Sequence, residues 1–161
     1  MLEQERLERD AKKKGEDHAR RSRKAAEQLA QLQEDLSSPV VIRGRQVFVP
    51  VRLRNGNAET EAMLLLDTGA TSSVITPEVA SRLNIGETDK IKVSVVGGRV
   101  LNVKKLVVTE MQVGPVSRER QEVVIISQPK GTMGDGLLGM SFLAGLKYTI
   151  DFQRQRLNWI P

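Results

Sequence analysis

The chain has 161 residues, which is room for one domain with its own core and an extension. It contains no cysteine and one histidine, His18, in a charged segment, so disulfides, zinc–thiolate sites and Cys-His or Ser-His catalysis are effectively excluded. The net charge is +5, but acidic and basic residues balance within residues 1–36, so the excess lies in residues 37–161. Those basic residues are scattered and aromatic residues make up 3%, which argues against nucleic-acid binding.

The sequence gives little information on the cellular compartment. No apolar run approaches the roughly 18 residues of a membrane-spanning helix, and no signal peptide is visible. We therefore expect no membrane contact by this segment itself. A periplasmic or membrane-tethered location, through a leader that has been removed, and a cytoplasmic location are both compatible with the sequence.

The first 36 residues are expected to form a charged helix, because they lack proline and are rich in good helix formers. Opposite charges recur four residues apart, as in Glu5 and Arg9. The apolar stripe covers about one and a half heptads, fewer than a confident coiled coil needs; it consists of Ala25, Leu29, Leu32 and Leu36. A solvated helix and a weak dimerising coiled coil both fit. Residues 37–44, beginning Ser-Ser-Pro, are expected to be a linker.

Residues 45–161 have the pattern of a mostly β domain. Short β-type runs alternate with turn signals, including an Asn-Gly hairpin turn at Asn55. Strands are expected at residues 47–53, 62–66, 74–75, 91–96, 99–103, 105–113, 121–127, 148–152 and 156–160. A short helix is expected to begin at Thr76-Pro77 and to end near residue 86, and residues 134–145 form a glycine-bounded apolar run. The pattern predicts a barrel-like domain with one or two short helices.

The most informative stretch is LLLDTGATSSVI, residues 64–75. A carboxylate at the end of an apolar strand is costly to desolvate, and it is usually tolerated for chemistry. Two such carboxylates within hydrogen-bonding distance share one proton. The ionised member can then accept a proton from water, while the protonated member donates to a substrate carbonyl. This chemistry requires no metal and no organic cofactor.

The run of apolar residues into Asp67-Thr68-Gly69-Ala70-Thr71, followed about seventy residues later by Leu137-Leu138-Gly139, resembles the retropepsin-like aspartic proteases. Bacterial single-domain members of that clan are the nearest in pattern. The resemblance spans roughly residues 45–160 and leaves out the N-terminal helix. It implies a mostly β, single-domain closed barrel and an aspartic endopeptidase that cleaves extended protein or peptide substrates.

The resemblance also implies roles for individual residues. Asp67 would be the catalytic carboxylate, Thr68 the lock between subunits and Gly69 the residue of close backbone approach. Ala70 and Thr71 would support the site. A strand beside the active site would contain Leu137, Leu138 and Gly139. A flap over the substrate would contain Val95, Val96, Gly97 and Gly98.

One chain supplies one Asp-Thr-Gly, whereas the chemistry requires two carboxylates. A homodimer with one Asp67 from each subunit meets this need. Asp135 is an internal alternative, although a turn residue before a buried strand is the preferred interpretation. Asp151 is expected to face outward. The terminal strand at Leu157–Ile160 would contribute to the subunit interface, with Trp159 either as an anchor there or as a core residue.

Two other functions fit parts of the pattern. A strand that leads into Asp-x-Gly also resembles the phosphate loop of actin-like kinases, but 161 residues leave no space for their two lobes. A protease-like fold without activity, serving as a dimeric binding or scaffold module, is the more serious alternative. Intact Asp67, Thr68 and Gly69 argue for the enzyme.

Overall fold

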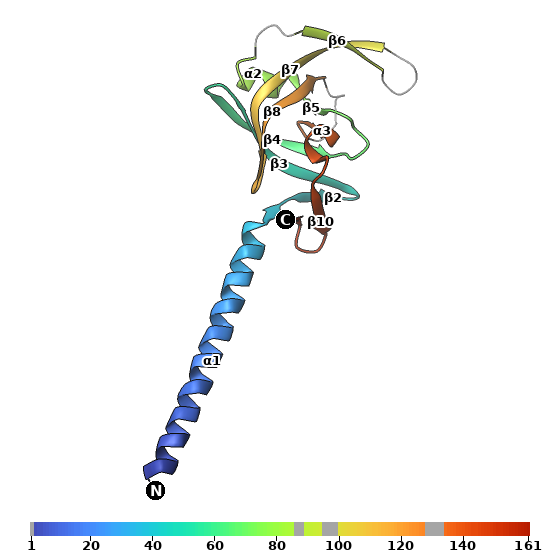
Figure 1. Ribbon diagram of the computed structural model, residues 1–161. Coiled ribbons are helices and arrows are strands. Elements are labelled where there is room, and N and C mark those ends of the chain that lie inside the picture. The colour runs from blue at the N-terminus through green and yellow to red at the C-terminus, as the bar shows by residue number, and fades with distance from the viewer. Residues whose placement is uncertain (1, 86–88, 95–99, 128–133) are drawn as a thin grey trace. The chain divides into compact units, whose positions relative to one another are not determined.

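The computed structural model describes residues 2–85, 89–94, 100–127 and 134–161, and it describes their side chains outside residues 89–102. The chain divides into two compact units, Met1–Asp35 and Leu36–Pro161. The first unit is one helix, α1 (Leu2–Asp35), as the sequence predicted (Figure 1). The second is mostly β (Figure 1).

Helix α1 has no buried residue along its described length. Leu29 and Leu32 are 57% and 54% exposed, and Asp17 and Arg20 form an ion pair of 2.7 Å along its surface. Pairing of α1 with a second helix stays a prediction. None of the described helices combines the length and the apolar character that crossing a membrane requires.

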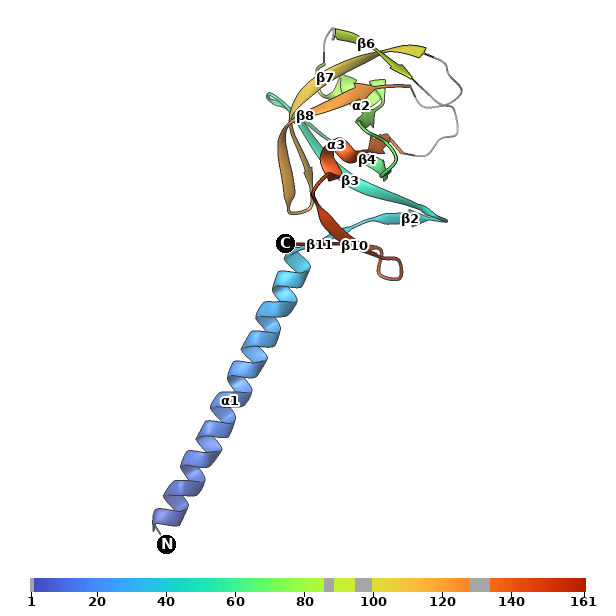
Figure 2. The same cartoon turned by 45° about the vertical axis from the view of Figure 1, so that its right-hand side comes forward.

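The second unit contains two sheets and two short helices. The larger sheet has the strand order β2-β3-β4-β9-β5-β8-β7-β6, and β7 also pairs with β3. Its strands are β2 (Val41–Arg43), β3 (Gln46–Asn55), β4 (Ala58–Leu66), β5 (Ser73–Ile75), β6 (Asp89–Ser94), β7 (Val100–Val113), β8 (Val116–Ile125) and β9 (Gly136–Leu138). The helices are α2 (Pro77–Arg82) and α3 (Met140–Leu143). Figure 2 shows the long β7 and β8 strands curving beside β3 and β4.

The core lies between these strands. Alternate residues of β3, namely Val49, Val51 and Leu53, are fully buried, as expected for a strand with one face inward. Leu64 of β4 and Phe142 of α3 are fully buried in the same cluster. Each such side chain contributes roughly 1.5–3 kcal/mol through its burial.

The elements predicted from periodicity mostly match. Thr76 caps α2 by accepting from the Val79 N–H, as its Thr-Pro sequence predicted. The two strands expected at residues 99–103 and 105–113 are instead one strand, β7, whose pairing with β8 begins at Lys104. Within this strand, Lys105 forms an ion pair with Glu122 on β8.

Residues 37–44, expected to be a linker, instead contain strands β1 (Ser37–Pro39) and β2. The three-stranded sheet has the order β1-β11-β10, with β10 (Lys147–Asp151) and β11 (Arg156–Ile160). The buried hydroxyl of Ser38 accepts a hydrogen bond of 3.0 Å from the Trp159 indole. These segments therefore belong to the domain.

The subunit-interface role predicted for Leu157–Ile160 stays a prediction, but it cannot take the form of strand pairing with β11 in this sheet. β11 is its central strand, and both hydrogen-bonding edges are occupied by β1 and β10 of the same chain. Trp159 is 6% exposed and stacks edge-on against Tyr148, so it is a core residue. Tyr148 itself is partly buried, and this desolvation raises its pKa.

Candidate active site

Asp67 directly follows β4, and the chain from it to Ser73 connects β4 to β5. Strand β9 lies between these two strands, parallel to β4 and antiparallel to β5. The Asp67 N–H donates to the Leu138 carbonyl at 3.0 Å, which continues the β4–β9 pairing by one residue. The backbone at Asp67 is therefore held by the strand that the sequence placed beside it.

The Asp67 carboxylate is oriented by its own loop. The Gly69 N–H donates to Asp67 Oδ1 at 2.9 Å, and the Ala70 N–H donates to the Asp67 carbonyl at 3.2 Å. A Cβ on Gly69 would lie 3.2 Å from Asp67 Oδ1, so glycine suits this close approach. Asp67 is half-buried, whereas Thr68 and Gly69 are exposed. The carboxylate is thus fixed in direction yet open to a reactant.

Two glycines allow β9 to lie against β5 and the Asp67 loop. Gly136 has φ +143°, and a Cβ there would meet the Val74 carbonyl oxygen at 1.9 Å. A Cβ on Gly139 would lie 2.5 Å from the Ser72 carbonyl oxygen. Between them Leu138 is fully buried and Leu137 half-buried. The pattern Gly-Leu-Leu-Gly therefore provides a core strand with a close backbone contact at each end.

The loop after Asp67 is also bonded to the start of α3. The Met140 N–H donates to the Ala70 carbonyl and the Ser141 N–H to the Thr71 carbonyl, each at 2.8 Å. Ala70 and Thr71 thus take part through their backbone carbonyls, and their role in supporting the site stays a prediction. Ser73 and Ser141, which form a partly buried link in the same region, carry no local sequence signal and were not predicted.

Asp135 is too far along the sheet to pair with Asp67 in the same chain. Its carboxylate Oδ2 accepts from the Met63 N–H at 2.9 Å, and its own N–H donates to the Met63 carbonyl at 2.7 Å. Met63 lies four residues before Asp67 on β4, which corresponds to about 13 Å along a strand. This agrees with the interpretation of Asp135 as a turn residue.

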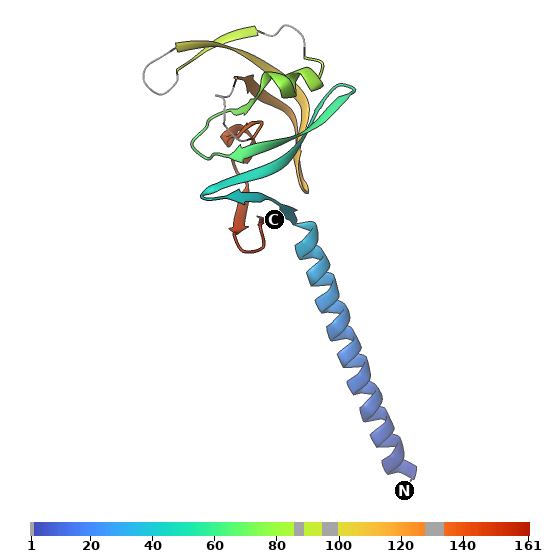
Figure 3. The ribbon, with the colours of Figure 1, turned by 180° about the vertical axis from the view of Figure 1, so that it is seen from behind.

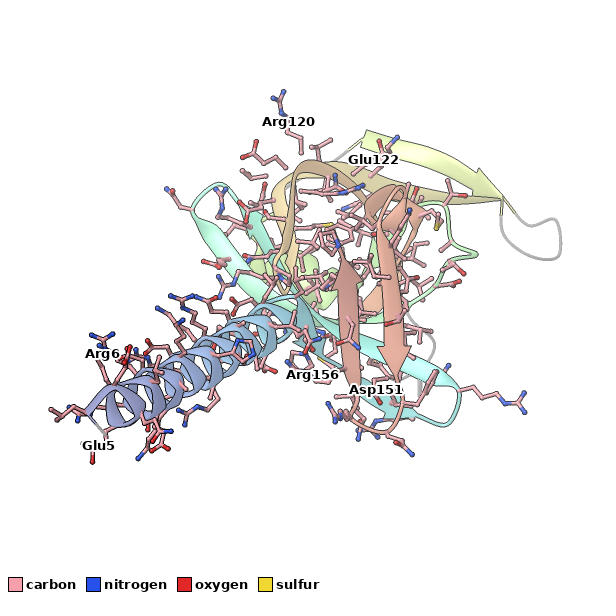
Figure 4. All side chains as sticks on the ribbon, turned by 60° about the horizontal axis from the view of Figure 1, so that its bottom comes forward. Glu5, Arg6, Arg120, Glu122, Asp151 and Arg156 are labelled. Atoms are coloured by element: carbon pink, nitrogen blue, oxygen red, sulfur yellow. The ribbon has the colours of Figure 1, made fainter. Side chains whose placement is uncertain are left out.

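Asp151 has a structural role at the end of the β10–β11 hairpin, where Figure 4 labels it together with Arg156. Its Oδ1 accepts from the backbone N–H groups of Gln153 and Arg154 at 3.1 and 3.0 Å. This is the turn geometry that aspartate commonly stabilises. Asp151 is therefore engaged away from the Asp67 loop.

The four residues predicted as a flap, Val95, Val96, Gly97 and Gly98, lie outside the described residues. The strands on either side of them are described: β6 and β7 pair antiparallel, from Asp89 with Lys105 to Ser94 with Val100. Figures 1 and 3 show this hairpin projecting to the same side of the domain as the β4–β5 connection. Within the described part of the chain, no three His, Cys, Asp or Glu side chains form a group suited to a metal ion.

Comparison with known proteins identifies the class that this fold and site define. Residues 49–142 match the family model described as aspartyl protease, and the chain belongs to that family. Its fold is similar to the crystal structure of a retropepsin-like aspartic protease from Rickettsia conorii, with a TM-score of 0.58 and 17% sequence identity. That match covers 75% of this chain and 86% of the other, and it shows a retropepsin-like fold. No curated protein matches the chain.

Proposed function

We propose that this protein is an aspartic endopeptidase that hydrolyses peptide bonds of an extended protein substrate. The observation that carries the proposal is the placement of Asp67, half-buried and held by the Gly69 N–H on a loop bonded to β9. Aspartyl protease family membership supports the same reaction class. The proposed catalytic unit is a homodimer with one Asp67 from each subunit.

In the proposed reaction, two Asp67 carboxylates share one proton at the twofold axis. The ionised carboxylate accepts a proton from a water molecule, whose oxygen attacks the substrate carbonyl carbon. The protonated carboxylate, the partner's Asp67, gives its proton to the carbonyl oxygen. The carboxyl group that took the water proton then gives it to the amide nitrogen, the other carboxylate takes a proton from a diol hydroxyl, and the C–N bond breaks. The pair is left with one shared proton, as at the start. The exposed Thr68 is the proposed contact between the two loops.

The proposed substrate-binding region is beside the Asp67 loop, on the side of the domain to which the β6–β7 hairpin projects (Figures 1 and 3). The position of this hairpin in Figures 1 and 3 supports a flap role for residues 95–98. An extended peptide would bind there through strand-like backbone hydrogen bonds. The closed barrel that the resemblance implies is supported by the pairing of β3 with β7 through Arg52–Arg54 and Glu110–Gln112.

A cleavage assay on an unfolded protein substrate tests the proposal, with Asp67→Asn as the inactive control. Peptide products formed by the wild type and absent with the variant support the enzyme. The alternative function, a catalytically silent dimeric binding module, predicts no products from either protein while both bind the substrate. Equal cleavage by both proteins would contradict Asp67 as the catalytic residue.

A further inference from the structure

The hydroxyl groups of Ser73 and Ser141 form a polar link inside the domain. Ser73 is fully buried at the start of β5, and Ser141 is half-buried in α3. The Ser73 N–H donates to Ser141 Oγ at 3.1 Å, and Ser73 Oγ accepts from the Gly139 N–H at 3.1 Å. The two hydroxyl oxygens are 3.5 Å apart. Burying these groups is costly unless they are paired, and here each has a partner.

This link joins the far end of the Asp67 loop to the turn between β9 and α3. The near end of the loop is held by the bond between the Asp67 N–H and the Leu138 carbonyl. Both anchors therefore lead to the same short segment, residues 138–141. Between them, Thr68 and Gly69 are exposed. The loop that carries Asp67 is therefore fixed to this segment at both ends.

We propose that the Ser73–Ser141 pair is a positioning device that sets the orientation of Asp67 for the proton-sharing pair. This inference rests on the proposed function, since it assigns a role within the same site. Two carboxylates share a proton only within hydrogen-bonding distance, so a small rotation of either loop weakens the pair. A displacement of about 1 Å at a reacting group can cost around 100-fold in rate.

Hydroxyl-dependent positioning can be separated from simple stabilisation by a matched pair of variants. Threonine and valine have nearly the same shape, but only threonine retains a hydroxyl group. Ser141→Thr therefore preserves the acceptor for the Ser73 N–H, whereas Ser141→Val removes it. Ser38→Ala supplies a stability control, because Ser38 is also buried and bonded at 3.0 Å, to Trp159 in the three-stranded sheet.

The experiment measures kcat, KM, the pH–rate profile and the melting temperature of the dimeric wild type and the three variants. We expect Ser141→Val to lose about 10- to 100-fold in kcat with little change in KM. Its bell-shaped pH profile should narrow, because weaker sharing brings the two apparent pKa values of the pair together. Ser141→Thr should recover most of the wild-type kcat and the wild-type profile. Ser38→Ala should melt at a lower temperature with unchanged kcat.

The inference is overturned if Ser141→Val, folded and dimeric, keeps the wild-type kcat and pH profile. It is equally overturned if Ser141→Val and Ser141→Thr lose kcat to the same extent. Failure of the proposed function has a different signature, since the wild type itself would then form no Asp67-dependent products. A Ser73→Ala and Ser141→Val double-mutant cycle on kcat adds a check, because members of one positioning link should be non-additive.

Discussion

Asp135 and Met63 hold each other by two hydrogen bonds, one through the Asp135 carboxylate at 2.9 Å and one through its backbone N–H at 2.7 Å. The Asp135 carbonyl also accepts from the Thr76 N–H at 3.1 Å, so this residue ties β4 to the end of β5. These three hydrogen bonds lie at the end of β9 that is remote from Asp67. Asp135, the internal alternative to a second Asp67, therefore has a structural role.

Asp135→Asn should retain most of the activity, because the amide oxygen can still accept from the Met63 N–H. Asp135→Ala removes that acceptor and should lower the free energy of unfolding by about 1–3 kcal/mol. Cleavage rates and denaturant titrations of both variants check this. A folded, dimeric Asp135→Asn protein without activity would instead make Asp135 a catalytic acid.

Asp67→Asn should abolish cleavage while the domain stays folded. The asparagine oxygen can still accept from the Gly69 N–H, so the loop keeps its geometry, but the amide cannot take a proton from water. We expect a loss of at least about a thousandfold in kcat/KM and a melting temperature close to that of the wild type. Asp151→Asn is the matched control, and it should cleave at the wild-type rate.

Gly139→Ala should disrupt the junction between β9 and the Asp67 loop. The added Cβ would lie 2.5 Å from the Ser72 carbonyl oxygen and 2.9 Å from that of Ala70, and backbone atoms cannot move aside cheaply. Overpacking of this kind costs about 1–3 kcal/mol. Gly15→Ala is the control for the same chemical change, because nothing lies within 4 Å of its Cβ. Equal melting temperatures for the two variants would contradict the close approach.

Stability should fall in acid partly through Glu110. Its pKa is lowered chiefly by the side-chain hydrogen bond from Arg54 and next by one from Ser117. The ion pair between Arg54 and Glu110, at 3.1 Å, joins β3 to β7. A carboxyl group whose folded-state pKa is lowered stabilises the fold above its unfolded-state pKa, and this contribution disappears as the pH falls through the folded-state value.

Glu110→Gln should therefore destabilise the protein more near neutral pH than near pH 3, because the contribution of the wild-type carboxylate shrinks as the pH falls toward its lowered pKa. Urea titrations of both proteins at the two pH values measure the difference. An equal difference in unfolding free energy between wild type and Glu110→Gln at both pH values would contradict this account.

The sequence predicted those parts of the fold that depend on local patterns. The Asn-Gly hairpin, the Thr76-Pro77 helix start and the apolar strand before Asp67 each follow from neighbouring residues. Strand β1 could not be found this way, because Ser-Ser-Pro is typical of a linker and β1 pairs with β11 more than a hundred residues later. Strand β2 pairs with β3 in a hairpin around Gly44, so it was a local feature that the prediction missed. The pairing of β11 on both edges could not be predicted locally either, because it depends on β1. The interface role of Leu157–Ile160 stays a prediction.

The residues of the candidate site were likewise predictable only where the signal is local. Asp67 and Gly69 could be selected because a carboxylate after an apolar strand, followed by a glycine, is unusual in sequence, and Gly139 through the resemblance to retropepsin-like proteases. Ser73 and Ser141 could not, since serine is common and their link spans 68 positions. What identifies them is burial without loss of hydrogen bonds, which only the folded chain reveals.

Catalysis should require the dimer. One Asp-Thr-Gly exists per chain, and proton sharing needs two carboxylates in contact. Asp135 cannot be the second one, because it is bonded to Met63, about 13 Å from Asp67 along the sheet. Specific activity should consequently fall on dilution below the dimer dissociation constant. Activity assays and sedimentation at matched concentrations check whether the two transitions coincide. A monomer that is fully active at working concentration would contradict the shared site.

Mixing experiments make the same requirement quantitative. When wild type and Asp67→Asn protein exchange subunits at equal amounts, random pairing leaves about a quarter of the dimers with two carboxylates. A mixed dimer has one carboxylate and cannot share a proton, so activity per wild-type chain should fall to about half of its unmixed value. Mixing with Asp151→Asn is the control and should cause no loss, because that residue stabilises a turn remote from the Asp67 loop. Activity that stays proportional to the wild-type chains present, with exchange verified by mass, would mean that each subunit works alone.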